Sequence, residues 1–466
     1  MRIAEKEKIL NKEMITVILS LAWPTMLEQL MQTTVQYIDT AMVGTLGTQA
    51  TAAVGSTGTI NWLVNGSIGA LSIGFLSYIA KACGAKDLEN ARRAAGQATL
   101  MVLVAGSFFT LLTVGLSSCI PVWMQVEEGI QELAGKYFLI LYAPMLFRTA
   151  TIIFGNVLRS VGDTKTPMKI GVIVNLLNIV LNFLFIYPVR EVEILGKNVA
   201  LYGAGWGVLG AALASAVAFV VGGILITIVL FRHPVISPKG QSFRPQWDIL
   251  HPCLRVAIPN MLQRFGTSLG YVFFAAMINS VGEVATAAHT IANTVESLFY
   301  IPAYGMQTAA ATLAGNAYGA RDNRKMQETS RMFIPIEVGL MFLTGSALFA
   351  VAPMLMGVFS TNQDVIDLGA TVLRMVAVTE PFYGFSIIVE GFMQGVGRTK
   401  APFIYNIIGM WGVRIVGTFI CTQWLGMGLV SAWTCMILHN LLLFTLFLVS
   451  YIRGSWNPMR TKEIKV

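Results

Sequence analysis

The sequence predicts an all-α polytopic membrane protein whose twelve transmembrane helices form two related six-helix lobes. Three observations predict this fold class: an apolar composition, apolar stretches of membrane-spanning length, and an internal repeat. Of the 466 residues, 55% are hydrophobic and 12% are charged, and the mean hydropathy is +0.66. Soluble proteins carry about 25% charged residues, so this composition indicates an integral membrane protein.

Twelve apolar stretches are long enough to cross about 30 Å of hydrocarbon as helices, which takes about 20 residues each. They cover residues 15–43, 52–80, 94–120, 130–157, 168–188, 206–231, 252–281, 286–315, 330–355, 366–394, 401–424 and 427–452. The first stretch is too long for the apolar region of a signal peptide, and no small-residue cleavage site follows it. We therefore expect the first helix to be retained.

The positive charges fall mainly on one side of the predicted helices. If both termini share that side, its tails and loops hold 25 of the 32 Lys and Arg residues, and the opposite loops hold three. Cytoplasmic loops carry such an excess, so we expect a protein of the cell (inner) membrane with both termini in the cytoplasm. The net charge of +8 then reflects topology and requires no nucleic acid. The five scattered cysteines, without CxxC spacing, predict neither disulfides nor a zinc site.

The two halves of the sequence are repeats related by a shift of 235 positions. Without a gap, PTMLEQLMQTTVQYIDTAMVGTLGTQATAA from Pro24 aligns with PNMLQRFGTSLGYVFFAAMINSVGEVATAA from Pro259. The same shift aligns GAKD with GARD and VGDTKTP with VGRTKAP. Six helices per repeat is an even number, so the lobes should share one orientation, related by a pseudo-twofold axis along the membrane normal.

The repeat predicts three parts of the chain. Residues 1–231 form an N-lobe with helices 1–6, residues 232–251 form a basic cytoplasmic linker, and residues 252–466 form a C-lobe with helices 7–12. Residues 189–202 are mostly extra in the first repeat. We expect them to form an extracytoplasmic loop.

Asp39 is a lone carboxylate in an apolar run that has no other charge after Glu28. The two residues are eleven positions apart, which places them within about 20° of each other on a helix, and Gln32 and Gln36 fall near the same stripe. A charged side chain in hydrocarbon costs roughly 2.5–3.5 kcal/mol on insertion scales, so both carboxylates should face the protein interior. This polar face suits a cavity for an ion or substrate; the alternative is hydrogen bonding between helices.

In the predicted fifth helix, Asn175, Asn178 and Asn182 share one face. A carboxylate with amide oxygens suits a hard cation, and it equally suits a hydrogen-bond network around a protonated Asp39. A third interpretation is a structural ladder of amides that hold helices together.

The second repeat lacks this arrangement, because the shift places Gln263 at the position of Glu28 and Phe274 at that of Asp39. A symmetric second cation site is therefore not expected. The second repeat carries other acidic residues inside predicted helices: Glu296, Glu337, Glu380 and Glu390.

Several of these acids lie beside tyrosines and are candidates for a substrate cavity. Glu296, Tyr300 and Tyr304 recur every four residues, so one helix face offers a carboxylate and aromatic rings to a cationic compound. Glu390 lies two turns from Tyr383 on one face and is a further candidate. The alternative is core packing around a satisfied carboxylate.

Four basic residues also fall inside predicted helices: Arg148, Arg264, Arg374 and Arg414. They either pair with Glu337, Glu380 or Glu390, or line a cavity that attracts anions. The second option keeps a lipid-linked or polysaccharide flippase of similar architecture as an alternative function. A scaffold or receptor that does not transport is disfavoured by the duplication and by the carboxylates inside helices.

At its motifs the sequence resembles the multidrug and toxic compound extrusion (MATE) family of cation-coupled exporters. The resemblance covers nearly the whole chain and rests on YIDTAMVG, VGDTKTP, NIVLNFLFIYP, GVLGAALAS and PAYGMQTAAATLAGNAYGA. It implies two six-helix lobes in a V and alternating access. It also implies secondary active antiport, in which amphipathic, often cationic, drugs or toxic compounds leave in exchange for H⁺ or Na⁺.

The resemblance further implies a cation-coupling site in the first lobe. The family uses an Asp of the first helix and a pair of Asn or Asp residues in the fifth, which match Asp39, Asn178 and Asn182. These three would be metal ligands only if Na⁺ is the coupling ion. Ser215 stands where the family often has Thr, and Asn182 stands where some members have Asp. The site therefore has one carboxylate fewer than in those members, which leaves the choice of coupling ion, H⁺ or Na⁺, open.

The chain contains no P-loop, HExxH or GxSxG motif. GWGVLG at 205–210 fits GxGxxG, but it opens a membrane helix and follows no predicted strand. We therefore expect no catalysis and no cofactor, so active transport must use an ion gradient. The expected partners are a small-molecule substrate and the lipid bilayer, and the protein is expected to be a monomer.

Overall fold

The computed structural model describes residues 2–55, 58–124, 126–194 and 197–460, and these are almost entirely helical. Among them, eight helices are long and apolar enough to cross a membrane, and two bent helix pairs raise the number to ten. The long helices α10 (Trp247–Asn279) and α11 (Glu283–Gly319) occupy the remaining two predicted positions. The predicted fold class, an all-α polytopic membrane protein, is confirmed.

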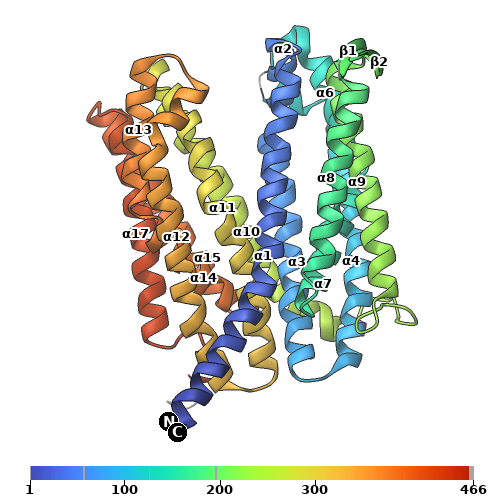
Figure 1. Ribbon diagram of the computed structural model, residues 1–466, viewed down its shortest axis with the longest axis vertical. Coiled ribbons are helices and arrows are strands. Elements are labelled where there is room, and N and C mark those ends of the chain that lie inside the picture. Colours follow the sequence, from blue (N-terminus) through green and yellow to red (C-terminus); the bar gives the residue numbers. More distant parts are fainter. Residues whose placement is uncertain (1, 56–57, 125, 195–196, 461–466) are drawn as a thin grey trace. The chain divides into compact units, whose positions relative to one another are not determined.

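The first repeat begins with a helix that extends well before the predicted first span (Figure 1). Its helices are α1 (Arg2–Gly44), α2 (Thr48–Gly55), α3 (Gly58–Gly84), α4 (Leu88–Gly115), α5 (Ile120–Trp123), α6 (Glu128–Tyr142), α7 (Met145–Ser160), α8 (Lys165–Phe185) and α9 (Gly207–Arg232).

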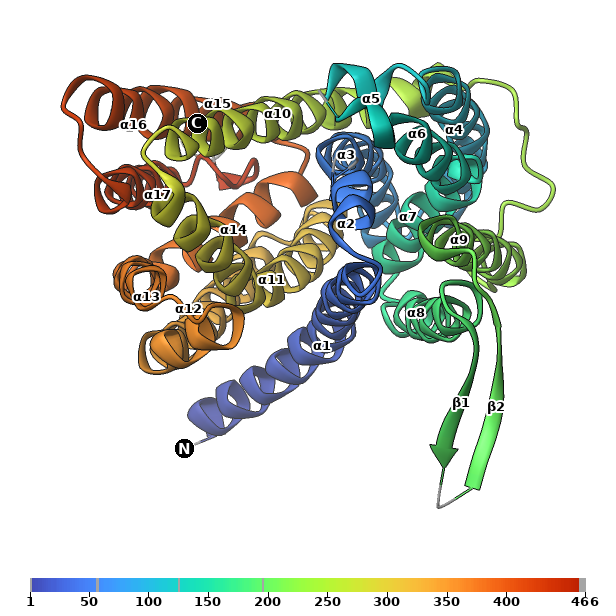
Figure 2. The ribbon, with the colours of Figure 1, turned by 90° about the horizontal axis from the view of Figure 1, so that it is seen from above.

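The segment predicted as an extracytoplasmic loop at 189–202 is an antiparallel hairpin of β1 (Pro188–Ile194) and β2 (Lys197–Ala204). Figure 2 shows it projecting away from α8 and α9. The alternating sequence VREVEI is typical of a strand, because successive side chains point to opposite faces. The loop expected here therefore contains a β-hairpin, and its extracytoplasmic side stays a prediction.

The second repeat contains α10, α11, α12 (Asn323–Phe359), α13 (Gln363–Ala377), α14 (Glu380–Gly395), α15 (Lys400–Ile407), α16 (Val416–Phe419) and α17 (Leu429–Ile452). The eleventh predicted helix is not regular. It includes two π-helical segments, η1 (Ile408–Ile415) and η2 (Ile420–Trp424), whereas its counterpart α8 is α-helical throughout. Such π-helical turns are frequent at functional sites.

The backbone repeats with the same shift as the sequence. Helices α3 and α11 end at Gly84 and Gly319, which are 235 positions apart. Lys86 (φ 60°) and Arg321 (φ 55°) are the non-glycine residues with positive φ in the described chain, and the same shift relates them. Because this conformation is uncommon for side chains other than glycine, its recurrence shows that each repeat makes the same turn.

The fourth and tenth predicted helices are each broken at equivalent positions. The bend between α6 and α7 is 47°, at residues 142–145, and the bend between α13 and α14 is 53°, at residues 377–380. Pro144 and Pro381 lie at these breaks, where a proline cannot donate the helical hydrogen bond. The prediction of one continuous helix at each place was wrong.

The chain divides into two compact units. We call Met1–Gln29, Leu76–Asp87 and His251–Val466 the first unit, and Leu30–Phe75 and Leu88–Leu250 the second unit. The first unit thus contains segments from both repeats. The lobe boundaries expected from the repeat stay a prediction.

In the second unit, α9 packs against α7 and α8 through small residues (Figure 1). A Cβ atom at Gly223 would lie 2.6 Å from the carbonyl oxygen of Phe147, and one at Gly222 would lie 2.8 Å from Val174. Glycine and alanine let helix backbones approach closely in membranes. Within the GVLGAALAS stretch of α9, a Cβ atom at Gly210 would overlap the carbonyl oxygen of Phe185, and Ser215 reaches Asn178, so this stretch holds α9 against α8.

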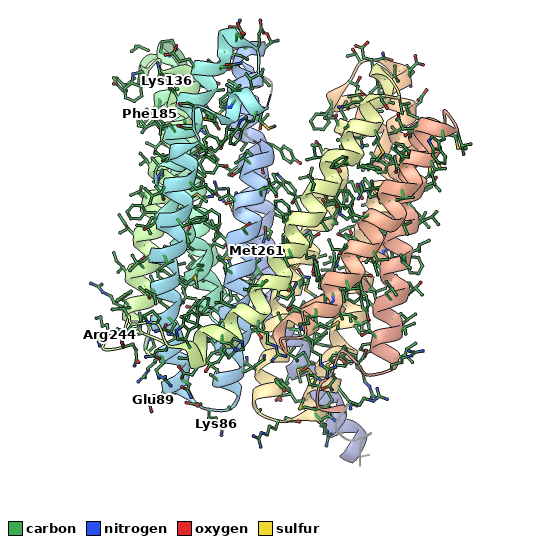
Figure 3. The ribbon with its side chains drawn as sticks, turned by 180° about the vertical axis from the view of Figure 1, so that it is seen from behind. Lys86, Glu89, Lys136, Phe185, Arg244 and Met261 are labelled. Atoms are coloured by element: carbon green, nitrogen blue, oxygen red, sulfur yellow. The ribbon has the colours of Figure 1, made fainter. Side chains whose placement is uncertain are left out.

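The ends of the second unit carry the loops that are predicted to lie on opposite sides of the membrane. Figure 3 shows Glu89 and Arg244 at one end of this unit and Lys136 and Phe185 at the other. Loops predicted to be cytoplasmic and loops predicted to be extracytoplasmic therefore lie at opposite ends of this unit.

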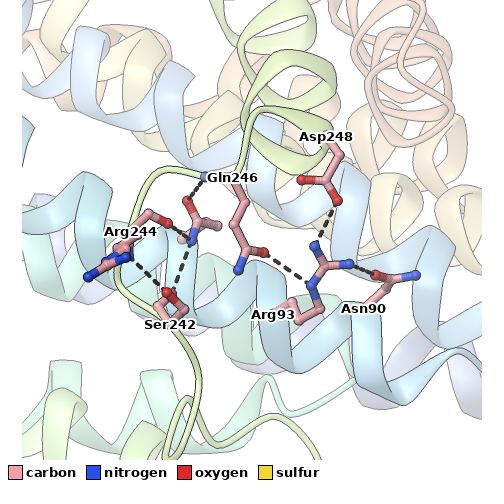
Figure 4. A network of polar contacts seen from close by, with 7 residues as sticks. Asn90, Arg93, Ser242, Arg244, Gln246 and Asp248 are labelled. Carbon is pink, nitrogen blue, oxygen red and sulfur yellow. Dashed lines mark hydrogen bonds and ion pairs between the residues drawn. The ribbon is translucent and has the colours of Figure 1, made fainter.

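The linker between the repeats is held against α4 of the second unit. Gln97 is fully buried and donates to the carbonyl oxygens of Ser242 (3.2 Å) and Arg244 (2.9 Å). The backbone N–H of Gln246 donates to Gln97 Oε1 at 3.0 Å, and Arg93 donates to Gln246 Oε1 at 3.1 Å (Figure 4). The linker is therefore an ordered segment, because a buried side chain satisfies its backbone groups.

The first unit is built around the contacts of α11, α12 and α14. Its core includes Phe333, Phe392 and Trp456, together with Ile18 and Leu21 from the start of α1. The core therefore joins both ends of the sequence in one unit.

Helices α3 and α11 cross at their C-terminal ends inside the first unit, without room for a side chain. A Cβ atom at Gly84 would overlap the carbonyl oxygen of Asn316, and one at Gly319 would overlap that of Lys81. The 235-residue shift exchanges the two pairs, because it relates Gly84 to Gly319 and Lys81 to Asn316. The crossing is therefore a reciprocal contact between equivalent parts of the two repeats.

This crossing predicts opposite effects for two glycine-to-alanine substitutions. Gly319→Ala should lower the thermal unfolding midpoint of the purified protein, because overpacking costs about 1–3 kcal/mol. Gly339→Ala on α12 is the matched control, since a Cβ there meets nothing within 4 Å, and alanine favours a helix. Tryptophan fluorescence during heating measures both. Equal midpoints for the two variants would contradict the reciprocal contact.

Candidate functional site

Asp39 of α1 is hydrogen-bonded to α8 inside the second unit. Asn182 donates from Nδ2 to Asp39 Oδ1 at 2.5 Å, and Asn182 is fully buried while Asp39 is half-buried. Asn182 Oδ1 is also buried and has no hydrogen-bond partner among the described residues. The lone carboxylate therefore has an amide donor, and an unused amide oxygen belongs to the same cluster.

Asn178, one turn before Asn182, reaches both Asp39 and Ser215. When its Nδ2 faces Asp39, it lies 2.9 and 3.2 Å from the two carboxylate oxygens, and its Oδ1 accepts from Ser215 Oγ at 3.1 Å. In the reverse orientation, Nδ2 donates to Ser215 Oγ at 3.1 Å and Oδ1 accepts from Asn182 at 3.3 Å.

The two orientations of this amide suit two states of Asp39. An ionised carboxylate accepts from N–H groups, so it favours the orientation in which Nδ2 faces it. A carboxyl group that carries a proton donates, so it favours the orientation in which the Asn178 oxygen faces it. A cation between the oxygens favours that second orientation as well. The cluster can therefore respond to the loading of Asp39 by an amide rotation.

The structure brings together four of the five residues predicted for cation coupling: Asp39, Asn178, Asn182 and Ser215. The fifth, Asn175, is half-buried and makes no hydrogen bond to this cluster in the described part of the chain. On α1, Gln32 and Gln36 are exposed, and Glu28 belongs to the first unit.

Sequence reasoning missed the aromatic and amide residues beside this cluster. Tyr137 is buried and interacts electrostatically with both Asp39 and Arg148. Asn61 Oδ1 accepts from Tyr142 Oη at 3.2 Å and from Arg148 Nη1 at 3.0 Å. A tyrosine in an apolar helix carries no special signal, but an asparagine inside a predicted span was a signal that could have drawn attention to Asn61.

The three tyrosines predicted for the substrate cavity form one cluster in the first unit. The hydroxyls of Tyr304 and Tyr383 are 3.0 Å apart, and the ring centroid of Tyr300 lies 6.0 Å from that of each of the other two. The rings meet edge to face, with Met341 and Ile387 packed against them. Their helices α11 and α14 are far apart in sequence, so the fold creates this cluster.

Glu390 of α14 is surrounded by amide donors. Its Oε1 accepts from Gln263 Nε2 at 2.9 Å and from Gln394 Nε2 at 3.0 Å, and its Oε2 accepts from Asn406 Nδ2 at 3.2 Å. Gln263 replaces the Glu28 of the first repeat, so the second repeat uses this position to bind a carboxylate.

The other acids of the first unit lie deeper. Glu296 interacts electrostatically with Glu380 and with Arg414. Both carboxyl oxygens of Glu337 and of Glu380 are buried without a hydrogen-bond partner among the described residues. Buried polar groups are normally paired, so these carboxyls are candidates for binding a proton or water.

The idea that the basic residues pair with Glu337, Glu380 or Glu390 was wrong, because no ion pair joins them in the described part of the chain. Their observed partners are aromatic rings, amides and backbone oxygens. Arg148 binds Asn61 and lies over Phe219, Arg264 lies over Tyr304, Arg374 donates to Phe349 O, and Arg414 lies over Tyr271 and Phe274.

The comparison with protein families matches each repeat separately. The MatE family model matches residues 24–184 and 259–420. The chain belongs to the MatE family. Members of this family are membrane transporters and not enzymes, so the resemblance found in the sequence is confirmed, as is the absence of an enzymatic function.

Relatives with similar sequences span nearly the whole chain. A protein of Thermotoga maritima, described as "Probable multidrug resistance protein NorM", is 27% identical over 97% of this chain and 94% of its own length. A Bacillus subtilis protein, "Probable multidrug resistance protein YoeA", is 23% identical over 88% of this chain and 87% of its own.

Solved structures of transporters share the fold. A multidrug resistance MATE family transporter in its outward-facing conformation superimposes with a TM-score of 0.87, at 25% identity, over 95% of this chain and 96% of its own. A transporter from Pyrococcus furiosus, whose binding pocket is described as having reverse polarity, superimposes with a TM-score of 0.85, at 25% identity, over 94% and 95%.

The geometry around Asp39 predicts different effects for two asparagines of α8. Asn178→Ala should raise the half-saturating concentration of the coupling ion about tenfold, because a hydrogen bond to a charged group contributes about 1.5–3 kcal/mol and water replaces part of it. Asn175→Ala, on the same helix but outside the cluster, should change this value little. Efflux of a fluorescent cation from proteoliposomes at graded Na⁺ and H⁺ concentrations measures both variants, and equal values for them would contradict the assignment.

Proposed function

We propose that the protein is a secondary active antiporter that exports amphipathic cationic drugs or toxic compounds in exchange for H⁺ or Na⁺. The observation that carries the proposal is the Asp39 cluster, in which a carboxylate inside a membrane-spanning helix faces Asn178 and Asn182. The names of the multidrug resistance relatives support the substrate class.

The cluster has the groups that ion exchange requires. Ion coupling needs a site that is filled and emptied in each cycle, so its charge must change or be compensated. Asp39 supplies the charge, and the unpaired Asn182 Oδ1 supplies a further oxygen for a cation or an acceptor for a proton. The Asn178 amide suits either state by rotation. The same arrangement serves Na⁺ and H⁺, so the choice between them rests on transport measurements.

The first unit supplies groups that suit a cationic substrate. Tyr300, Tyr304 and Tyr383 present aromatic rings, and Glu296 and Glu390 are acids on the same two helices. Aromatic faces attract organic cations, by about 2 kcal/mol or more where water is excluded. These five residues are our candidates for the substrate cavity.

Transport by alternating access is part of the proposal, and its support is the duplication. The repeats share their backbone turns, bends and helix ends, so equivalent helices are available to open alternately on the two sides. We assign the protein to the inner membrane as a monomer, with an N-lobe of residues 1–231, a linker of 232–251 and a C-lobe of 252–466.

One observation favours a second candidate function, the movement of an anionic or lipid-linked compound. Arg148 is half-buried in the second unit and binds Asn61, without an ion pair to a described carboxylate. The reverse pocket polarity described for the Pyrococcus furiosus transporter shows that polarity varies among similar structures. Transport assays with an anionic and a cationic fluorophore separate the two functions.

The proposed coupling role predicts a specific failure for Asp39→Asn. This substitution preserves shape and hydrogen bonding but fixes the group as neutral, so the variant should insert and still bind the exported compound. Gradient-driven efflux of a fluorescent cation from proteoliposomes should disappear. Wild-type protein at matched membrane abundance is the reference.

Two controls make this result interpretable. Binding of the same fluorescent cation in detergent shows that the variant is folded, and Asp364→Asn, at an exposed position of α13, should pump normally. If Asp39→Asn also pumps normally, Asp39 is a packing residue, and coupling must be sought among the remaining acids.

The predicted topology can be tested by labelling in a variant without the five native cysteines. Single cysteines at three positions should react with an impermeant maleimide from outside: Thr48, Glu128 and Asn198. Cysteines at three other positions should react only after the membrane is opened: Asp87, Gly240 and Asn323. A consistent reversal at one of these positions would overturn the helix count.

A further inference from the structure

We propose that the linker between the repeats binds anionic phospholipids of the cytoplasmic leaflet. The binding face consists of four exposed side chains, which we call the linker surface: Lys239, Phe243, Arg244 and Trp247. The inference goes beyond the proposed export function. It rests on the predicted topology, which places the linker in the cytoplasm.

The second unit itself holds the backbone of the linker in one conformation. Buried Gln97 of α4 donates to the carbonyl oxygens of Ser242 and Arg244, so these backbone groups point toward the helix (Figure 4). Helix α4 comes close to the linker here, because a Cβ atom at Gly96 would lie 3.0 Å from Cβ of Gln241. The segment that carries the linker surface therefore lies directly on α4. Little backbone freedom is lost when its side chains bind a ligand.

The two cations of the linker surface have no acidic partner. Lys239 and Arg244 are exposed, and no ion pair involves either of them in the part of the chain that the structure describes. The acid that is nearest to Arg244 along the chain, Asp248, is bound by Arg93 at 2.8 Å. Lysine and arginine bind phosphate oxygens, and arginine does so with two parallel hydrogen bonds. The linker surface therefore offers two cations to an anionic ligand.

Two exposed aromatic rings lie within three positions of Arg244 in the sequence. Phe243 is 44% exposed and Trp247 is 68% exposed. Trp247 is the first residue of α10 and precedes the seventh predicted span, which begins at residue 252. Tryptophan is enriched at such helix ends, because its apolar body faces the acyl chains and its N–H group faces the headgroups. The rings therefore suit a ligand that has an apolar part as well as a charge.

The position of the linker surface along the second unit agrees with the level of lipid headgroups. Figure 3 shows Arg244 set back from the tip that carries Glu89, toward the body of the helices. Arginine and lysine side chains near the ends of membrane helices extend to the headgroup region. A phospholipid whose phosphate meets Arg244 can therefore extend its acyl chains along the apolar surface of the helices.

The charge at this end of the second unit favours an anionic lipid over a zwitterionic one. Residues 88–93, 159–169 and 232–248 together hold eight Lys or Arg residues and three acids, Glu89, Asp163 and Asp248. The three segments lie together, because Arg92 donates to the carbonyl oxygen of Val235 at 2.8 Å and His233 lies 4.0 Å from Asp163. Clusters of basic residues beside membrane helices attract anionic lipids. The excess of positive charge therefore complements a headgroup with a net negative charge.

Removing the two cations tests the linker surface directly. In the double variant Lys239→Gln, Arg244→Gln, the dissociation constant of dioctanoyl phosphatidylglycerol should rise about tenfold or more, because both charges that meet the phosphate are gone. Native mass spectrometry of the purified full-length protein in detergent measures this constant. The fold should be unchanged, since Gln97 binds backbone groups of the linker. An unfolding midpoint equal to that of wild type, measured by tryptophan fluorescence, checks this.

A second double variant, Lys325→Gln, Arg331→Gln, is the matched control. Both residues are exposed on α12 of the first unit, and the net charge falls by the same amount, so the dissociation constant should change less than about twofold. Equal losses of affinity in the two double variants would overturn the proposal, because the attraction would then be a property of the whole charge. Wild-type affinity in Lys239→Gln, Arg244→Gln would overturn it as well.

Two further ligands identify what the linker surface recognises. Dioctanoyl phosphatidylcholine should bind the wild-type protein clearly more weakly than phosphatidylglycerol does, and a large excess of inorganic phosphate should leave phosphatidylglycerol bound. Equal affinity for the two lipids would overturn the preference for an anionic headgroup. Displacement by inorganic phosphate would overturn the lipid in favour of a free anion.

Failure of the linker surface is distinguishable from failure of the proposed function. The binding measurement requires no transport, so Asp39→Asn should bind phosphatidylglycerol with the wild-type dissociation constant whether or not it pumps. If a cysteine at Gly240 reacts from outside, the assignment of the surface to the cytoplasmic leaflet is overturned, while coupling at Asp39 stands.

Discussion

The arrangement of the second unit depends on one constraint: a carboxylate inside a membrane-spanning helix must find polar partners within the protein. Lipid offers none, and an ionised group in hydrocarbon costs several kcal/mol. Asp39 meets this need through Asn178 and Asn182 of α8. Their positions depend in turn on α9, because its glycines and alanines let α8 approach until Asn178 reaches Ser215. Helix packing and the polar cluster are thus one arrangement.

The duplication preserved the backbone and changed the polar chemistry. The shift that relates the two bends, the two positive-φ residues and the two glycine contacts also relates Asp39 to Phe274. Phe274 lies 4.1 Å from the guanidinium of Arg414, so the second repeat places an aromatic ring and a cation where the first has a carboxylate. Gln263, at the position of Glu28, donates to Glu390. Equivalent positions therefore hold partners of a different kind in each repeat.

The sequence was sufficient for the fold class, the repeat and the shared face of Asn178 and Asn182, because each follows from composition or from the period of one helix. It was insufficient for contacts between helices. The partners of Arg148 and Glu390 depend on the rotation of helices that are distant in sequence, and hydropathy carries no information on that rotation. Pairing the arginines inside predicted helices with acids was the simplest expectation, and their partners are aromatic rings, an amide and a backbone oxygen instead.

The local errors have a physical reason as well. Hydropathy windows joined α6 to α7 and α13 to α14, because the residues around Pro144 and Pro381 are as apolar as the helices beside them. The prolines themselves were the available signal, since they remove a helical hydrogen bond. The hairpin was missed because its alternating sequence was treated only as an insertion. Hydropathy and segment length thus predict where membrane helices lie, whereas backbone hydrogen bonding decides where a helix breaks and where a hairpin forms.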